Sequence, residues 1–155
     1  MEAATITKTD GNKMKAIYKG QEHEVTNLTQ YSVELEGVKK SVLVAQGTLK
    51  PENSAEIVKQ ELPANSIIQV IGRRWFERTN GNTYHSAVLL VNGEHIGKES
   101  FTYGYGDQYI QTGRAILLNA FNVAGLDTQT PLWSLRELGH KFNSSVSDVA
   151  RKKDL

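Results

Sequence analysis

Two short segments concentrate the side chains that could bind a ligand. Residues 73–86 read RRWFERTNGNTYHS, and residues 101–112 read FTYGYGDQYIQT. Arginine can clamp a phosphate with two parallel hydrogen bonds, aromatic rings stack on flat ligands, and carboxamides bind the edges of nucleobases. These residue types therefore predict a recognition site built from both segments, although they do not name its ligand.

The first segment is predicted to be a β-hairpin, in which side chains alternate between two faces. Arg74, Phe76 and Arg78 then share one face, with Trp75 on the other. A ring between two guanidiniums could hold a flat anionic group. The alternative is an exposed, salt-bridged sheet face on which Phe76 is half-buried. On the next strand, Tyr84 and His85 point to opposite faces, and His85 fits a hydrogen-bonded scaffold role better than a catalytic one.

The second segment joins a strand to a helix. Gly104 and Gly106 leave backbone amides uncovered where the helix begins, which favours an anion. Asp107 stands at the N-cap position and could satisfy the same amides itself, so the Gly-Tyr-Gly sequence predicts a tight turn before it predicts a phosphate loop. Tyr103 and Tyr105 add two rings with hydroxyl groups beside the turn.

The helix that follows carries a polar edge with three-residue spacing. If this edge lies next to the Asn80–Asn82 hairpin tip, the arginines, carboxamides and tyrosines form one composite site. The candidate ligand-binding residues are Arg74, Phe76, Arg78, Asn80, Asn82, Tyr84, His85, Tyr103, Tyr105, Asp107, Gln108, Gln111 and Arg114.

Composition excludes several classes of site. The 155 residues contain no cysteine, which rules out disulfides, thiolate zinc sites and cysteine nucleophiles, and the four histidines lack the spacing of a helical metal pair. We find no paired carboxylates, nucleophile elbow or phosphate-binding loop. We therefore expect a protein that binds no metal and no cofactor and that is not an enzyme. The longest apolar run is residues 87–91, too short to span a membrane, and we expect a cytoplasmic protein.

The hydrophobic pattern predicts an α+β chain in four parts. These are a flexible tail (1–13), a small antiparallel β meander or SH3-like barrel (14–50), an α-β-β-β-α recognition module (53–142) with an antiparallel sheet, and a polar tail (143–155). Within the module we expect a helix at 55–61, strands at 67–78, 83–91 and 94–102, a long helix at about 107–123, and a short helix at 132–138.

The two segments together resemble a signature found in small, mostly uncharacterised proteins of bacteriophages and prophages. The matching residues are RWFxRxxGNTYHS from Arg74, then the VNG of residues 91–93, then YGYGDQYxQT from Tyr103. The resemblance implies a phage or prophage origin and action in the bacterial cytoplasm. Small phage proteins often counter host defences, including by sequestering nucleotide signals.

Three functional hypotheses follow. The leading one is a non-catalytic binding protein that holds a nucleotide or other phosphorylated small molecule in host-defence evasion. The first alternative is RNA or DNA binding, prompted by the α-β-β-β-α order of double-stranded-RNA-binding domains, although the net charge of +1 offers no basic excess. The second is an inhibitor that binds a host protein through Trp75, Phe76 and Arg74. A face carrying Ile67, Ile71 and Trp75 could also support a homo-oligomer.

Overall fold

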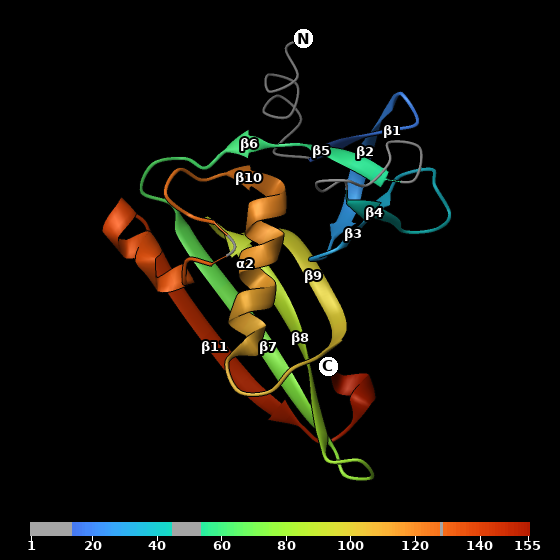
Figure 1. The fold of residues 1–155 in the computed structure, drawn as a ribbon, viewed down its shortest axis with the longest axis vertical. Helices are drawn as coiled ribbons and strands as arrows, with labels where there is room; N and C mark the ends of the chain where they lie inside the picture. Colours follow the sequence, from blue (N-terminus) through green and yellow to red (C-terminus); the bar gives the residue numbers. More distant parts are fainter. Residues whose placement is uncertain (1–13, 45–53, 128) are drawn as a thin grey trace.

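The structure is a computed structural model that describes residues 14–44, 54–127 and 129–155. The chain is mostly β, with a closed five-stranded barrel followed by a four-stranded sheet that one long helix crosses (Figure 1). The predicted tail 1–13 and the predicted boundary around Lys50–Asn53 lie outside the described residues. No helix in the described part of the chain is long and apolar enough to cross a membrane.

The predicted N-terminal β meander closes into a barrel. Strands β1 to β5 pair in chain order, and β5 returns to pair antiparallel with β1. Alternate side chains such as Ala16, Val33 and Ile57 fill the interior, as the period of two requires. The strands are β1 (Lys15–Tyr18), β2 (Gln21–Leu28), β3 (Ser32–Leu35), β4 (Val42–Val44) and β5 (Ser54–Val58).

The predicted helix at 55–61 is wrong. These residues form most of β5 and the short strand β6 (Gln60–Glu61), so the α-β-β-β-α order is not formed. Ala55 and Ile57 are buried while Glu56 between them is exposed, which is a strand alternation. Since β5 bonds to both β1 and β4, closing the barrel outweighs the weak helical tendency of a seven-residue segment.

The three central strands confirm the prediction for residues 67–102 to within about one residue. They are β7 (Ile67–Glu77), β8 (Asn82–Val91) and β9 (Glu94–Tyr103), joined as an antiparallel meander. The turn between β8 and β9 has positive φ at both Asn92 (53°) and Gly93 (83°), the conformation that an Asn-Gly turn favours.

The predicted polar tail from residue 143 is largely a fourth strand. Strand β11 (Lys141–Val149) pairs in parallel with β7 along its whole length, and the short turn η3 (Lys152–Asp154) follows it. The strand is polar because it lies at the sheet edge and one of its faces is open to solvent. Only Phe142, which is buried, and Val146, which packs against the core, mark its inner face.

Helix α2 (Gln108–Ala120) lies across one face of this sheet, and the predicted helix at 107–123 is therefore confirmed but shorter. Two glycines permit the close approach: a Cβ on Gly72 would lie 2.5 Å from the Tyr109 ring, and one on Gly113 would lie 2.6 Å from Val70. The predicted short helix is the 3₁₀ helix η2 (Leu132–Leu138). It follows the two-residue strand β10 (Phe121–Asn122), which pairs with β6.

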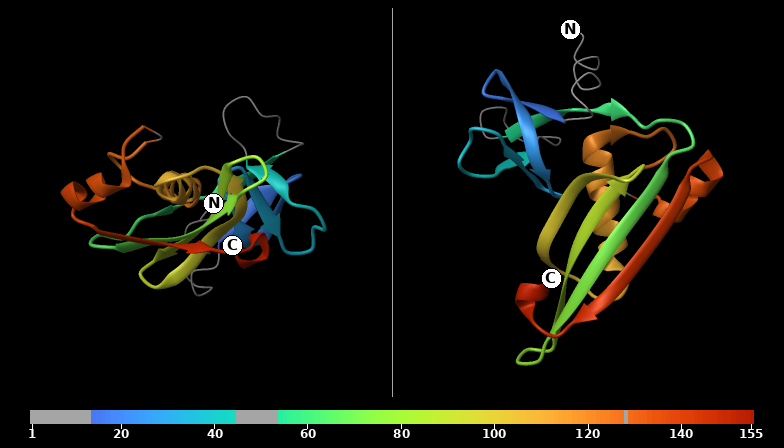
Figure 2. Two further views of the ribbon diagram at one scale, coloured as in Figure 1. Left: turned by 90° about the horizontal axis from the view of Figure 1, so that it is seen from below. Right: turned by 180° about the vertical axis from the view of Figure 1, so that it is seen from behind.

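The barrel sits against β9 and α2 at one side of the sheet (Figures 1 and 2). Asn27 exchanges two hydrogen bonds of 3.0 Å with the backbone of Lys98, and the Asn119 amide donates to the carbonyls of Thr29 and Gln30. The barrel therefore leaves the sheet face opposite α2 open, rather than docking on it.

Candidate functional site

The thirteen candidate residues lie in different places and do not line one pocket. Arg74, Phe76 and Tyr105 line a small hollow; Arg78, Asn80 and Asn82 lie at the hairpin tip; Tyr84 and Tyr103 lie on the open sheet face; His85 is buried; and Asp107, Gln108, Gln111 and Arg114 line clefts beside α2.

The hollow at Arg74 measures about 290 Å³ and is lined by residues of the hairpin and of the glycine junction, but neither the hairpin tip nor the polar edge of α2 reaches it. Arg74 is already engaged there: its Nε donates to Oδ1 of Asp148 at 2.8 Å, and its Nη1 donates to the Gly106 carbonyl at 3.2 Å. Phe76 is 55% exposed. The arrangement matches the salt-bridged sheet face rather than a free anion clamp, because the Asp148 carboxylate neutralises the guanidinium.

The hairpin tip satisfies its own polar groups. The backbone NH and the side-chain amide of Asn80 both donate to Oε2 of Glu77, at 3.2 and 3.0 Å, and the Gly81 NH donates to the Glu77 carbonyl. Asn82 begins β8 directly after this turn. These carboxamides stabilise the tip and do not converge with the polar edge of α2.

His85 has the scaffold role that the sequence favoured. Its side chain is 1% exposed, with Nδ1 3.1 Å from the Gly104 carbonyl and Nε2 2.8 Å from the Thr112 hydroxyl. Since a carbonyl only accepts, Nδ1 carries the proton and Nε2 accepts from Thr112. Burial lowers the pKa of His85, opposed by the bond to Gly104. The imidazole thus holds the glycine junction against the sheet in its neutral form.

The glycine junction works as a tight turn. Gly104 (φ 152°) and Gly106 (φ 62°) have backbone angles that other residues rarely adopt, and a Cβ on Gly104 would meet His85 and Gln108. Asp107 occupies the N-cap position, but its side chain makes no capping hydrogen bond, contrary to prediction. Tyr105 stands 70% exposed beside the turn.

Tyr84 and Tyr103 belong to a group of rings on the open sheet face, which we call the aromatic row. Tyr84 stacks on Phe101 (centroids 4.6 Å apart, 17° between planes) and on Trp75 (5.9 Å, 27°), and meets Tyr103 edge-on at 5.8 Å. The sequence did not predict this row. Which side chains of β9 lie next to those of β8 depends on a shift in the register between the two strands, and the sequence does not show this shift.

The polar edge of α2 faces the barrel across a cleft of about 860 Å³, which we call the barrel–helix cleft. It is larger than the hollow at Arg74 and than a third cleft of about 500 Å³ between α2 and η2, where Trp133 is 62% exposed. The polar and charged side chains that line it are Gln30, Glu56, Lys59, Gln108, Gln111, Thr112, Arg114, Asn119 and Asn122, with the ring of Tyr31.

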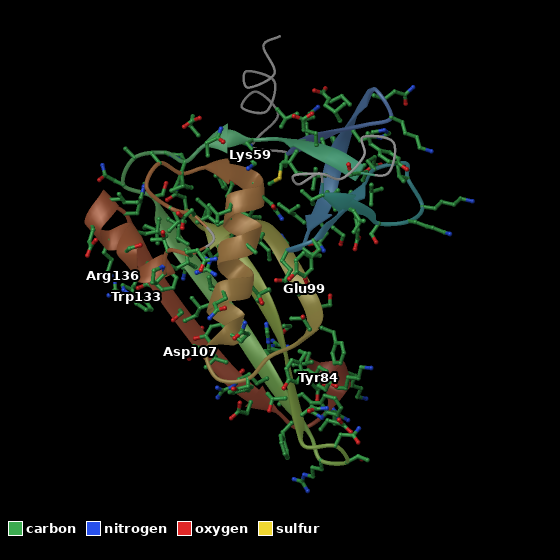
Figure 3. All side chains as sticks on the ribbon, viewed as in Figure 1. Lys59, Tyr84, Glu99, Asp107, Trp133 and Arg136 are labelled. Carbon is green, nitrogen blue, oxygen red and sulfur yellow. The ribbon has the colours of Figure 1, made fainter. Side chains whose placement is uncertain are left out.

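Two cations and one acid set the charge of the barrel–helix cleft. Lys59 lies beside the C-terminal end of α2, whereas Asp107, at the opposite end of the helix, lines the cleft between α2 and η2 instead (Figure 3). Arg114 lies between, and its Nη1 donates to the Thr130 carbonyl at 3.1 Å. Glu56 faces the cleft from β5. Hydrogen bonds from Thr130 and Gln129, with a smaller contribution from Arg114, lower the pKa of nearby Asp127.

Half of this cleft escaped prediction. Gln108, Gln111 and Arg114 were predicted as one edge, and the same helical spacing extends that edge to Leu118, beyond which Asn122 of β10 also lines the cleft. The lining residues on the barrel side, among them Gln30, Glu56 and Lys59, have no local sequence signal, because a meander residue becomes a lining residue only when the barrel docks.

The described residues contain no group of three or more His, Asp or Glu side chains that could hold a metal ion. No protein-family model matches the chain, and comparisons with curated proteins and with solved structures find no match. The site is therefore interpreted from its own residues.

Proposed function

We propose that this protein is a non-catalytic binding protein that holds a nucleotide or other phosphorylated small molecule in the barrel–helix cleft. The observation that carries the proposal is the lining: carboxamides from α2 and the barrel, one tyrosine ring and two cations border one concave space of about 860 Å³. That volume is in the range of ligand sites.

The carboxamides suit the edge of a nucleobase. The Gln108 amide donates to the Gln111 carbonyl at 3.1 Å, which leaves a carbonyl on one side chain and an NH₂ on the other. An adjacent acceptor and donor is the pattern that a base edge requires, and it survives if both amides are flipped. The Tyr31 ring, 65% exposed across the cleft, offers a face for stacking.

The two cations suit phosphate. Lys59 is exposed, and among the described residues no hydrogen bond or ion pair holds its ammonium. Arg114 donates one NH to the neutral Thr130 carbonyl and keeps its positive charge, which the nearby Asp127 carboxylate offsets in part. Glu56 could accept from a sugar hydroxyl. By contrast, the Arg74 hollow already holds the Asp148 carboxylate and would repel a phosphate.

Action in evading a bacterial host defence is part of the same proposal. It rests on the resemblance to phage and prophage proteins alone, and a nucleotide signal of the host would be the matching ligand class.

Calorimetric titration of the full chain with inorganic phosphate, nucleoside mono- and triphosphates and cyclic dinucleotides tests the proposal. We expect one nucleotide class to bind, and Lys59→Ala and Gln111→Ala each to weaken it about tenfold or more, as expected for the loss of about 1.4 kcal/mol. Lys39→Ala, an exposed lysine elsewhere on the barrel, is the matched control. If no member of the panel binds, or if all three variants behave alike, the proposal is wrong.

A further inference from the structure

The sheet face opposite α2 is a second surface, separate from the barrel–helix cleft. It is open along most of its length in the described part of the chain, with η3 at one end (Figure 2). Apolar side chains stand unusually exposed on it: Ile67, Ile71 and Phe101 are each more than a third exposed, and Tyr103 is 59% exposed. An exposed apolar face of this kind indicates a surface that binds a partner.

Charge decides which occupant fits. By strand register, this face carries Arg73, Lys98 and Lys141, against Glu77 as the only acidic side chain from the described strands. Turn η3 adds Lys152, whose Nζ lies 4.6 Å from the Phe101 ring centroid. A second copy of the chain would bring two positive faces together, whereas a polyanion would be attracted.

Few of these cations are neutralised by their contacts. Arg73 donates to the backbone carbonyl of Asp154 at 3.0 Å, which leaves its charge intact, and the Asp154 carboxylate is paired with Arg151 at 3.0 Å. Glu77 accepts both hydrogen bonds of the hairpin tip. The positive excess therefore remains available to solvent.

The aromatic row adds a chemical preference. Trp75, Tyr84 and Phe101 come from neighbouring strands and stack on one another, so their planes stand upright on the sheet and their edges face outward. Ring edges carry the positive part of the quadrupole and tyrosine hydroxyls donate hydrogen bonds, and both favour phosphate oxygens. Tyr103, edge-on to Tyr84 at the end of the row, has an exposed ring on which a base can stack.

From this combination we infer that the open sheet face binds single-stranded nucleic acid. Arg73, Lys98 and Lys152 contact successive phosphates, and Tyr103 stacks on a base. A duplex fits less well, because the broad, shallow sheet cannot enter a groove and a duplex keeps its bases away from Tyr103. This activity goes beyond the proposed nucleotide site and uses none of its residues.

Fluorescence anisotropy with labelled 20-nucleotide single-stranded DNA, single-stranded RNA and duplex DNA tests the inference. We expect the single strands to bind more tightly than the duplex, with affinity falling steeply between 50 and 200 mM salt. The double variant Arg73→Ala/Lys98→Ala should lower affinity at least tenfold and reduce the slope of log K against log salt by about 1.4, since each lost contact with a single strand removes about 0.7. The DNA and RNA arms show which sugar is preferred.

Controls separate this surface from the rest of the molecule. Tyr103→Ala should weaken binding without changing the salt slope, because it removes stacking and no charge, and Lys39→Ala should change neither quantity. Lys59→Ala should leave oligonucleotide binding intact even if it abolishes nucleotide binding, so the two proposals fail independently. Salt-insensitive binding, a preference for duplex, or a stable dimer that buries this face would overturn the inference.

Discussion

Nε2 of His85 accepts a hydrogen bond from the hydroxyl of Thr112 across 2.8 Å, which joins the centre of the sheet to the second turn of α2. The other ring nitrogen donates to the carbonyl of Gly104. One neutral side chain therefore fixes strand, glycine junction and helix to one another. Both bonds are buried. We therefore expect their loss to lower the free energy of unfolding and not to change ligand binding directly.

Acidification should destabilise the protein through His85. Burial lowers the folded-state pKa below the ordinary value of 6.5, so the unfolded chain takes up a proton first as the pH falls. The stabilisation is present above pH 6.5 and is lost as the pH falls towards the folded-state pKa. Urea denaturation at pH 7.5 and 5.5 should show this loss in the native chain and a smaller loss in His85→Gln, which cannot titrate.

Glu99 supplies a control of opposite sign. Burial raises its pKa above the ordinary value of 4.5, against smaller opposing hydrogen bonds from Gln30 and Thr29. Its stabilisation is present below pH 4.5 and is lost as the pH rises through the folded-state pKa. Glu99→Gln should therefore enlarge the loss on acidification, or leave it unchanged. An undiminished loss in His85→Gln would show that another group is responsible.

Removing the Thr112 hydroxyl should be costly. Thr112→Val keeps the shape of the side chain but leaves Nε2 of His85 buried without a donor, which costs about 1–3 kcal/mol. Thr26→Val removes an exposed hydroxyl bonded to the Glu34 carbonyl and should change stability by less than about 0.5 kcal/mol. Chemical denaturation of both variants makes the comparison, and equal losses would mean that the His85 bond contributes nothing specific.

Gly97→Ala should loosen the junction between barrel and sheet. A Cβ at Gly97 would collide with the carbonyl oxygen of Leu28, which is barrel backbone and cannot rotate away. We expect a loss of about 1–3 kcal/mol in thermal or urea unfolding. Gly113→Ala should lose less, since the clash is with the Val70 methyl groups and alanine favours the helix by up to about 1 kcal/mol. A larger loss for Gly113→Ala than for Gly97→Ala would mean that the barrel shifts easily to accommodate the added methyl group.

Sequence reasoning succeeded where structure is set locally. The Asn92–Gly93 turn and its two strands were predictable because the turn residues themselves determine the backbone angles. It failed where tertiary pairing decides: residues 55–61 become strands to close the barrel, and residues 141–149 become a strand because β7 has a free edge. The same reason explains the site, since the polar edge of α2 was visible and its partners from the barrel were not.

Strand β11 offers the last prediction, because a solvated tail and an edge strand respond differently to one substitution. Phe142 is buried against the core, whereas neighbouring Asn143 points to the open face. Phe142→Ala should cost about 3–5 kcal/mol, and Asn143→Ala should change stability little. Hydrogen exchange on the native chain should show protected amides within residues 141–149, where β11 bonds to β7. Rapid exchange throughout this segment, together with unchanged stability of the Phe142→Ala variant, would show that the segment is a solvated tail and not an edge strand.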